Sequence, residues 1–400
     1  MSRSEVAVVG GGLAGMTAAL TLARGGRKVA LIAPAPGVAD GRTTALMDQS
    51  IRLLDRLGVW GAIAPSAAAL STMQILDGTR RLFRAPPVAF RSSEIGLPAF
   101  GYNMPNTALL AVLADHVRQD ANITLYDSSA QSFELGSEQA TIMLDQGDKV
   151  QADFVIGADG RRSAVREAAG IGTRTWSYPQ TALVLNFAHT IPHRNVSTEF
   201  HGESGPFTQV PLPGNRSSLV WVLNPAIAEQ MMALDVSELS RRVEERMQSM
   251  LGTVSVEDGA QTWPLSGMTA HRFGKGRVAL VGEAAHAFPP IGAQGLNLSL
   301  RDVMALESLL CSSPDMPISG TAGDAFDRKR RTDVISRTAS VDLLNRSLLS
   351  DFVPVQMVRA AGLHVLSTIA PLRHIVMQEG IEPGRGFSAL PRMLREKVRR

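Results

Sequence analysis

In the run Gly10-Gly11-Gly12-Leu13-Ala14-Gly15, three of the four glycines, Gly10, Gly12 and Gly15, have a spacing that suits phosphate binding. They follow an apolar segment that predicts a strand and begin a segment that predicts a helix. In such a turn Gly10 permits a tight bend, Gly12 lets the main chain approach a pyrophosphate, and Gly15 lets helix and strand pack closely. The free N–H groups at the helix start, at Leu13 and Ala14, then face the phosphates. The pattern predicts a dinucleotide site, and the alternative is a tight structural turn.

One residue departs from the dinucleotide pattern. An acid that binds ribose hydroxyls is expected at the end of the second strand, where the sequence has Ala33. Losing one hydrogen bond to a charged acceptor costs about 1.5–3 kcal/mol, which is about ten- to a hundredfold in affinity. Weaker binding is therefore expected, but not its absence.

Two further stretches combine strand ends with polar residues. Residues 153–166, DFVIGADGRRSAVR, predict a strand followed by Asp159 and a helix start. Residues 281–302, VGEAAHAFPPIGAQGLNLSLRD, run from a strand into Gly282 and Glu283, then through two prolines and two glycines into a helix. So many residues without bulk or without a main-chain donor predict a turn against which a ligand fits closely.

The elements around these stretches predict the architecture. Residues 5–32 predict a β–α–β unit, and therefore a parallel sheet. Residues 43–60 predict an amphipathic helix, and residues 236–251 predict another within a mostly β region. We predict an α/β protein with a discontinuous Rossmann-like cofactor domain, an inserted β-sheet substrate domain and a C-terminal helical region. The ranges are 1–70, 100–172 and 270–345 for the cofactor domain, 71–99 and 173–269 for the substrate domain, and 346–400 for the C-terminal helices.

Composition excludes several classes of protein. The 400 residues are 44% hydrophobic and carry a net charge of only +3, which does not indicate nucleic-acid binding. A single cysteine, Cys311, excludes an internal disulfide and fits a reducing compartment. His189 and His193 have helical spacing in a β-like segment, so no metal site is expected. The glycines break the one long apolar run, so a cytoplasmic protein without a transmembrane helix is expected.

Taken together and in this order, the three stretches resemble the single-component FAD-dependent aromatic hydroxylases of the p-hydroxybenzoate hydroxylase type. The chain is most similar to the ubiquinone-biosynthesis hydroxylases of the UbiH and UbiF type. The resemblance covers nearly the whole chain, including DGRTTALMDQSIRLLDRLGVW, GYNMPNTALLAVL, GPFTQVPLP, SSLVW and FDRKRRTDVISRTASVDLLNRSL.

The resemblance implies roles for particular residues. Arg42 would lie by the flavin or its phosphates, and Asn106 stands where an Arg or Gln often touches the flavin. The acid after Gly282, here Glu283 in place of the usual Asp, would bind the ribityl chain. Asp159 belongs to the second stretch of the cofactor site. Along the isoalloxazine would lie Pro290, the bare Gly292 and Gly295, and the N–H groups of Leu296 and Asn297. His286 is expected to be a packing residue, and Asp302 an internal contact.

The resemblance also implies the reaction. NAD(P)H or another electron donor would reduce FAD, and O₂ would give a flavin hydroperoxide that transfers oxygen to a phenol. The cofactor does this chemistry, and no catalytic side chain is assigned. With one dinucleotide motif in the chain, NAD(P)H would bind transiently, near Arg42 and Asp159.

The substrate class stays open at this point. A polyprenylated phenol requires an apolar pocket, and the basic tail from Arg385 could contact an anionic membrane, next to other ubiquinone-biosynthesis enzymes. A peripheral position at the inner membrane and a solvated tail are equal alternatives. A hydroxylase of a soluble aromatic or secondary metabolite, and a non-catalytic flavoprotein or assembly subunit, also remain.

Overall fold

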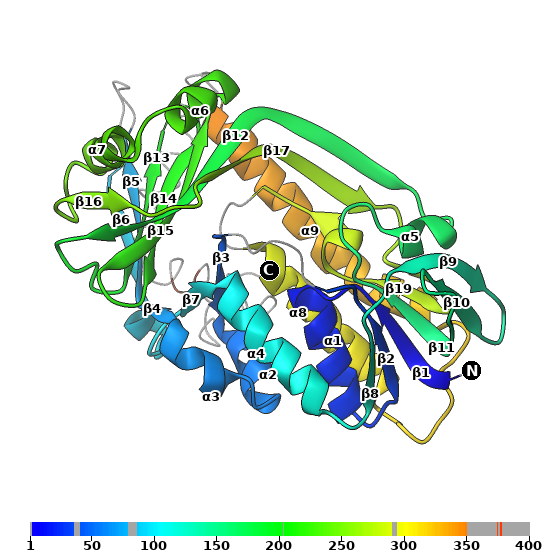
Figure 1. Ribbon diagram of the computed structural model, residues 1–400. Coiled ribbons are helices and arrows are strands. Elements are labelled where there is room, and N and C mark those ends of the chain that lie inside the picture. The colour runs from blue at the N-terminus through cyan, green and yellow to red at the C-terminus, as the bar shows by residue number, and fades with distance from the viewer. Residues whose placement is uncertain are drawn as a thin grey trace, which may run out of the picture.

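The computed structural model describes residues 2–35, 41–78, 86–202, 204–289 and 294–349, together with His374 and Met377. Two sheet-based regions are connected by a long helix, α9, and by two long strands, β12 and β17 (Figure 1). One region is built on an eight-stranded sheet and the other on a nine-stranded sheet, and a three-stranded sheet completes the set.

The eight-stranded sheet has a parallel centre. Its order is β18-β19-β11-β1-β2-β8, and β9 and β10 extend it beside β11. Parallel strands are covered on both faces and are therefore apolar throughout, as in β2, where every residue is buried. The strands are β1 (Ser2–Val9), β2 (Val29–Ile32), β8 (Ile123–Tyr126), β9 (Ala130–Leu135), β10 (Ala140–Leu144), β11 (Lys149–Gly157), β18 (Gly274–Lys275) and β19 (Val278–Leu280).

The helices of this region pack on the parallel sheet and on one another. α1 contacts both α4 and α8, and Figure 1 shows these three side by side. They are α1 (Leu13–Arg24), α2 (Asp48–Arg56), α3 (Trp60–Ile63), α4 (Asn106–Gln119), α5 (Ala164–Ala168), α8 (Gln294–Leu310) and α9 (Ala322–Leu349), with the short 3-10 turns η1 (Ala64–Ser66) and η3 (Gly282–Ala284).

The nine-stranded sheet has the order β20-β17-β12-β15-β14-β13-β5-β6, with β16 beside β12. Two helices, α6 (Pro225–Met232) and α7 (Val236–Arg246), cover one of its faces, where buried side chains of the sheet and the helices form a single cluster. Its strands are β5 (Thr72–Asp77), β6 (Val88–Arg91), β12 (Thr173–His189), β13 (Val196–His201), β14 (Pro206–Leu212), β15 (Arg216–Leu223), β16 (Val254–Val256), β17 (Gln261–Ala270) and β20 (His286–Ala287); η2 (Ser92–Ile95) follows β6.

The predicted helix over residues 43–60 is wrong at its start. Residues 43–47 form a strand, β3 (Thr43–Met47), which pairs with β7 (Gly101–Pro105), and β7 also pairs with β4 (Ala68–Leu70). The two β-branched threonines favour a strand. Leu46 is fully buried in the main core from this strand, whereas the sequence pattern had placed it on a helix.

The predicted helix over residues 236–251 also ends early, because α7 stops at Arg246. Gln248 and Ser249 have φ angles of 55° and 51°, in the left-handed region that a helix cannot contain. α6, which the sequence pattern did not predict, precedes it.

The predicted substrate segments share one sheet. β5 and β6 come from residues 71–99. They belong to the same sheet as strands β12 through β17, because β5 pairs in parallel with β13. The division into domains stays a prediction. Of the predicted C-terminal helices, residues 346–349 are the end of α9; His374 and Met377 apart, residues 350–400 lie outside the described residues. Within the described part of the chain, every helix is too short or too polar to cross a bilayer.

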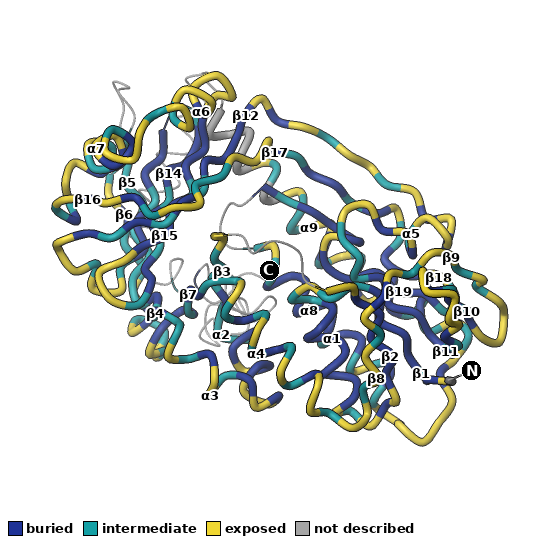
Figure 2. The backbone as a smooth tube through the Cα atoms, viewed as in Figure 1, coloured by how far each residue is buried: buried dark blue, intermediate teal, exposed yellow. Residues whose placement is uncertain are grey.

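Burial follows this layout. Figure 2 shows the central strands of both large sheets, such as β1 and β15, mostly buried, whereas β8 at the sheet edge and much of α6 and α7 are exposed. The main core lies between the parallel sheet and its helices, and a second core lies between the nine-stranded sheet and α7.

Candidate functional site

The three chemical stretches of the sequence meet at one edge of the parallel sheet. β1, β11 and β19 are neighbours, and their last residues, Val9, Gly157 and Leu280, lie opposite one another in register. The turn of each stretch comes directly after one of these strands. Because the carboxyl ends of parallel strands share one edge, pairing alone brings the three stretches together, at the place where α/β proteins bind ligands.

The glycine turn has the geometry that the sequence predicted. Gly10 has φ = 116°, and a Cβ there would lie 2.2 Å from the carbonyl oxygen of Ala158. A Cβ on Gly15 would lie 1.9 Å from the carbonyl oxygen of Gly10, so helix and turn approach closely. A Cβ on Gly12 would meet nothing within 4 Å. Gly12 is the N-cap of α1 and no side chain caps the helix, so the described part of the chain leaves the helix N-terminus open.

The turn's neighbours complete the first part of the site. Leu13 and Ala14 are half-buried in the first turn of α1. Gly282, with φ = 61°, sits so that a Cβ on it would lie 3.3 Å from the Cβ of Ala14. Position 33 lies beside the turn as expected, since a Cβ on Gly11 would be 2.6 Å from that of Ala33. The predicted loss of affinity from Ala33 is untested.

Asp159 has one carboxylate oxygen without a partner. Its Oδ2 accepts a hydrogen bond from the main-chain N–H of Val165 at 3.1 Å. Its Oδ1 is buried and has no hydrogen-bond partner among the described residues. A buried unpaired oxygen costs free energy, so Asp159 has the chemistry to accept a hydroxyl from a ligand beside the glycine turn.

Glu283 lies at the surface of this edge. Its carboxylate forms an ion pair with Arg161 at 3.3 Å, and both side chains are about half exposed. Arg166 donates to the carbonyl oxygen of Ala284 at 2.9 Å, which fastens the second stretch to the third. An exposed ion pair contributes about 0–1 kcal/mol, so Glu283 can exchange its partner for a ligand at small cost.

Arg42 lies just before β3 and Asn106 just after β7, where the first residue of β3 pairs with the last residue of β7. The N–H of Asn106 donates to the carbonyl oxygen of Arg42 at 3.0 Å. The side-chain Oδ1 of Asn106 is buried and unpartnered among the described residues. The guanidinium of Arg42 lies 5.0 Å from the ring centre of Trp263 on β17, so Arg42 reaches the nine-stranded sheet.

The first residues of α8 have different surroundings: Gly295 is open, whereas the Asn297 side chain is bonded to neighbouring elements. A Cβ on Gly295 would meet nothing within 4 Å, and Leu296 is half-buried. The Asn297 side chain accepts from Met47 N and Ser50 Oγ and donates to the carbonyl oxygen of Ala45, each at 2.8 Å. It therefore holds α8 against β3 and α2. The predicted contacts at Pro290 and Gly292 lie outside the described residues.

A buried charge network supports the third stretch. Asp302 on α8 accepts from His286 Nε2 at 2.7 Å, from Gly282 N at 3.3 Å and from Arg330 Nε at 2.8 Å. Burial alone raises the pKa of Asp302, but His286 and Arg330 outweigh burial and hold that pKa below its ordinary value. His286 also stacks on Phe288, with ring centres 5.3 Å apart. The expected internal role of both His286 and Asp302 is confirmed.

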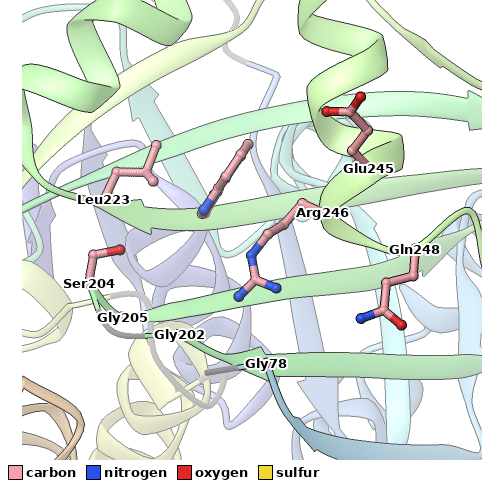
Figure 3. Close-up of a pocket in the computed structure, with 9 residues that line it drawn as sticks. Gly78, Gly202, Ser204, Gly205, Leu223, Glu245, Arg246 and Gln248 are labelled. Carbon is pink, nitrogen blue, oxygen red and sulfur yellow. The ribbon is translucent and has the colours of Figure 1, made fainter. Parts of the chain in front are cut away.

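A separate pocket of about 440 Å³ lies at the far end of the nine-stranded sheet (Figure 3). Trp221, Leu223 and Arg246 line it, and the Arg246 guanidinium lies 5.7 Å from the ring centres of Phe200 and Phe207. Trp221 and Leu223 belong to the face of the sheet that packs on α7. Among the described residues, the predicted cofactor residues are absent from the lining of this pocket.

The edge of the parallel sheet fits a flavin dinucleotide. For phosphates it offers the N-terminus of α1 beside Gly12, which has no side-chain cap. For hydrogen bonds it offers the Oδ1 atoms of Asp159 and Asn106, which have no partner among the described residues. Because a long ligand must pass from the glycine turn toward β3 and β7, these groups suit a molecule with phosphates at one end and a polar ring at the other.

Comparison with known proteins agrees with this geometry. Residues 3–331 match the family described as FAD binding domain. The chain is 33% identical to ubiquinone hydroxylase UbiL of Rhodospirillum rubrum, over 98% of this chain and 92% of that protein. It is 30% identical to 3-demethoxyubiquinol 3-hydroxylase of Escherichia coli, over 90% and 94% respectively.

Solved structures share the fold. The crystal structure of p-nitrophenol 4-monooxygenase PnpA from Pseudomonas putida matches with a TM-score of 0.78 and 21% identity, over 96% of this chain and 100% of that chain. PqsL of Pseudomonas aeruginosa in complex with 2-aminobenzoylacetate matches with a TM-score of 0.73, over 91% and 100%. From the family match and the two hydroxylase relatives it follows that this chain belongs to the FAD-binding-domain family and is an FAD-dependent monooxygenase of the aromatic-hydroxylase type.

Proposed function

We propose that this protein hydroxylates the aromatic ring of a polyprenylated phenol in ubiquinone biosynthesis, with O₂ as co-substrate and NAD(P)H as the reductant. The observation that carries the proposal is the 33% identity, over almost the whole length of both chains, to a protein named ubiquinone hydroxylase. The alternative, a hydroxylase of a soluble aromatic, has less support. The similarity of this chain to p-nitrophenol 4-monooxygenase is one of fold alone.

The residues at the sheet edge divide the binding of FAD between them. The N–H groups of Gly12, Leu13, Ala14 and Gly15 bind the pyrophosphate, with Gly10 allowing the turn. The hydroxyl-bearing middle of the cofactor meets Asp159, Gly282 and Glu283. The ring end meets Arg42 and Asn106, the glycines 292 and 295, Pro290, and the main chain of Leu296 and Asn297. When bound, FAD supplies the redox chemistry that activates O₂.

The protein's own part is to bind, orient and exclude water. The start of α8 presents a helix N-terminus, which favours negative charge on a reduced ring. The nine-stranded sheet turns half-buried apolar side chains toward the cofactor region, among them Val184, Val210 and Val220. This surface suits an apolar substrate better than a charged one.

The test uses purified protein, FAD, NADPH and a short-chain prenylphenol such as 2-geranylphenol. We expect NADPH oxidation that depends on the phenol, and a product heavier by one oxygen atom that comes from labelled O₂. NADPH oxidation that yields only hydrogen peroxide with every prenylphenol would reject the proposed substrate class. A deletion strain that makes normal quinone would reject the pathway.

We also propose peripheral contact with an anionic membrane, through the tail RGFSALPRMLREKVRR from Arg385, which has six basic residues and one acid. Co-sedimentation with vesicles tests this: binding to vesicles that contain anionic lipid, and loss of binding at high salt, are expected. Equal binding to neutral vesicles contradicts an electrostatic contact.

A further inference from the structure

The nine-stranded sheet has one face that turns toward the cofactor region. Phe187, Leu219 and Trp221 belong to the opposite face, under the helices. Ser218 accepts a hydrogen bond from Thr43 Oγ1 at 2.9 Å, and Asn186 donates to the carbonyl oxygen of Gly41 at 2.9 Å. Because paired and alternate residues share a face, Ser218 and Asn186 define the inner face of the sheet.

One row of this inner face carries a carboxylate among apolar side chains. Glu199, Thr208, Val220 and Val184 lie directly opposite one another on β13, β14, β15 and β12. All four are half-buried. The row, called here the inner row, is two residues or about 7 Å along the strands from Ser218. Ser218 in turn bonds to Thr43, next to Arg42, whose carbonyl receives the N–H of Asn106.

The region on the other side of the inner row is covered. Ala182 and Val222 pack with Tyr178 and Leu265 in a small buried cluster, and the hydroxyl of Tyr178 donates to Asp342 on α9 at 2.7 Å. The inner row thus lies between side chains that contact the cofactor-binding region and side chains near α9. A ligand that extends from the ring end of the cofactor site past Ser218 would reach Val220 in this row, and Glu199 lies two strands farther across the same face.

Glu199 is held in place on two sides. Its Oε1 accepts from His201 Nε2 at 2.9 Å, and its Oε2 accepts from Thr208 Oγ1 at 3.2 Å. The side chain of His201 is 7% exposed and that of Glu199 is 19% exposed, so the histidine lies behind the carboxylate. Each carboxylate oxygen can accept more than one hydrogen bond, so Glu199 can bind a further O–H group.

Glu199 is the charged member of the inner row. On β14 and β15 the neighbours are Thr208 and Val220, which are uncharged. On β5 the residue opposite Glu199 is Ile75, and Asp77 lies opposite His201. On the far face, Arg246 stacks on Phe200. A carboxylate in an apolar wall complements a ligand that is apolar except for one hydroxyl, which describes a prenylated phenol.

We propose that Glu199 binds the phenolic hydroxyl of the substrate and takes its proton, and that His201 is a positioning residue that holds the carboxylate. This inference rests on the proposed function. The O–H bond of the phenol breaks, the proton goes to a carboxylate oxygen of Glu199, and the electron pair stays on the phenolate oxygen. The more electron-rich ring then accepts an electrophilic oxygen atom faster, and the proton returns to the phenolate oxygen of the product.

The test compares Glu199→Gln with the matched control Glu257→Gln, an acid of the same sheet region whose carboxylate is paired with Arg216 at 2.6 Å. With 2-geranylphenol, Glu199→Gln should lower kcat by about a hundredfold, within the range for acid–base catalysis, and the control should lower it less than twofold. With a ring-fluorinated, more acidic 2-geranylphenol, the loss of kcat in Glu199→Gln should be at least tenfold smaller. An equal loss with both phenols, or no loss, overturns the proton transfer.

A binding measurement separates this inference from the proposed function, because it needs no turnover. Titration of FAD-loaded protein with 2-geranylphenol and with its O-methyl ether, followed by the visible spectrum, gives the two dissociation constants. Glu199→Gln should weaken binding of the phenol about tenfold and leave binding of the ether unchanged. His201→Gln, which keeps a donor to Glu199, should retain binding and lower kcat. Equal weakening of phenol and ether contradicts a bond to the hydroxyl.

If wild-type protein binds the phenol in this way but does not hydroxylate it, the proposed function fails while the binding role of Glu199 stands.

Discussion

The two large sheets of this protein present polar groups in different ways. At the edge of the parallel sheet the site consists mostly of main chain: a helix N-terminus, close-packed glycines and few side chains. On the inner face of the nine-stranded sheet the polar groups are side chains, such as Glu199 and Thr208, spaced by strand pairing. A main-chain site needs particular glycines at fixed spacing and is visible in a sequence, whereas a side-chain site assembled from several strands is not.

The largest effect is expected at Asp302, which joins the two regions: it binds Gly282 after β19 and His286 in β20, a strand of the nine-stranded sheet. Asp302→Asn removes the buried carboxylate that His286 and Arg330 share, while Arg330 keeps its ion pair with Asp333 at 2.6 Å. It should therefore cost about 3 kcal/mol in the free energy of unfolding, the low end for breaking a buried pair. Urea denaturation measures this. Asp153→Asn, which breaks an exposed pair with Arg3, should cost less than about 1 kcal/mol. Equal losses of unfolding free energy in the two variants would contradict the idea that Asp302 connects the two regions.

The same carboxylate predicts a pH dependence. The folded-state pKa of Asp302 is lowered from its ordinary value of 3.8, so its contribution to stability is present above that value and is lost as pH falls through the folded pKa. Wild-type stability should therefore decline below about pH 4, and Asp302→Asn should flatten that decline. Unfolding midpoints between pH 5 and pH 2.5 check this, and parallel curves would contradict it.

The main-chain character of the cofactor edge can be tested at Gly12. Gly12→Ala adds a Cβ that meets no protein atom within 4 Å, so the melting temperature should not change. The Cβ points into the space for phosphate and should weaken FAD binding about tenfold to a hundredfold, equivalent to losing one charged hydrogen bond. Fluorescence titration measures this. Gly61→Ala, also without neighbours, is the control, and an equal change in both variants would contradict the assignment.

The inner face is tested by exchanging one methyl group for a hydroxyl at two valines. Val220→Thr, on the half-buried inner row, should raise the KM for 2-geranylphenol about threefold to tenfold, from the loss of about 1 kcal/mol of apolar contact. Its stability should change little. Val256→Thr, at a buried residue on the helix-covered side, should lower stability by about 1–3 kcal/mol with KM unchanged. The reverse pattern would place the substrate on the other face.

The smallest effect is expected at Glu283. Glu283→Gln removes an exposed ion pair with Arg161, so stability should fall by less than about 1 kcal/mol. FAD affinity should fall several-fold if the side chain reaches the ribityl chain. Unchanged FAD affinity with unchanged stability would mean that Glu283 is a surface residue only.

The sequence by itself determined the cofactor edge, because each chemical stretch directly follows an apolar strand and needs only parallel pairing to meet the others. Gly10, Gly12 and Gly15 were predictable because main-chain geometry leaves few alternatives at such a turn. Tertiary structure alone decided that residues 43–47 are a strand, because pairing with Gly101–Pro105 outweighs the helical spacing of Leu46. It also decided that the Asn297 side chain holds β3 and that Glu199 and His201 lie on the inner face of the nine-stranded sheet, since register between distant strands selects the face on which a side chain lies.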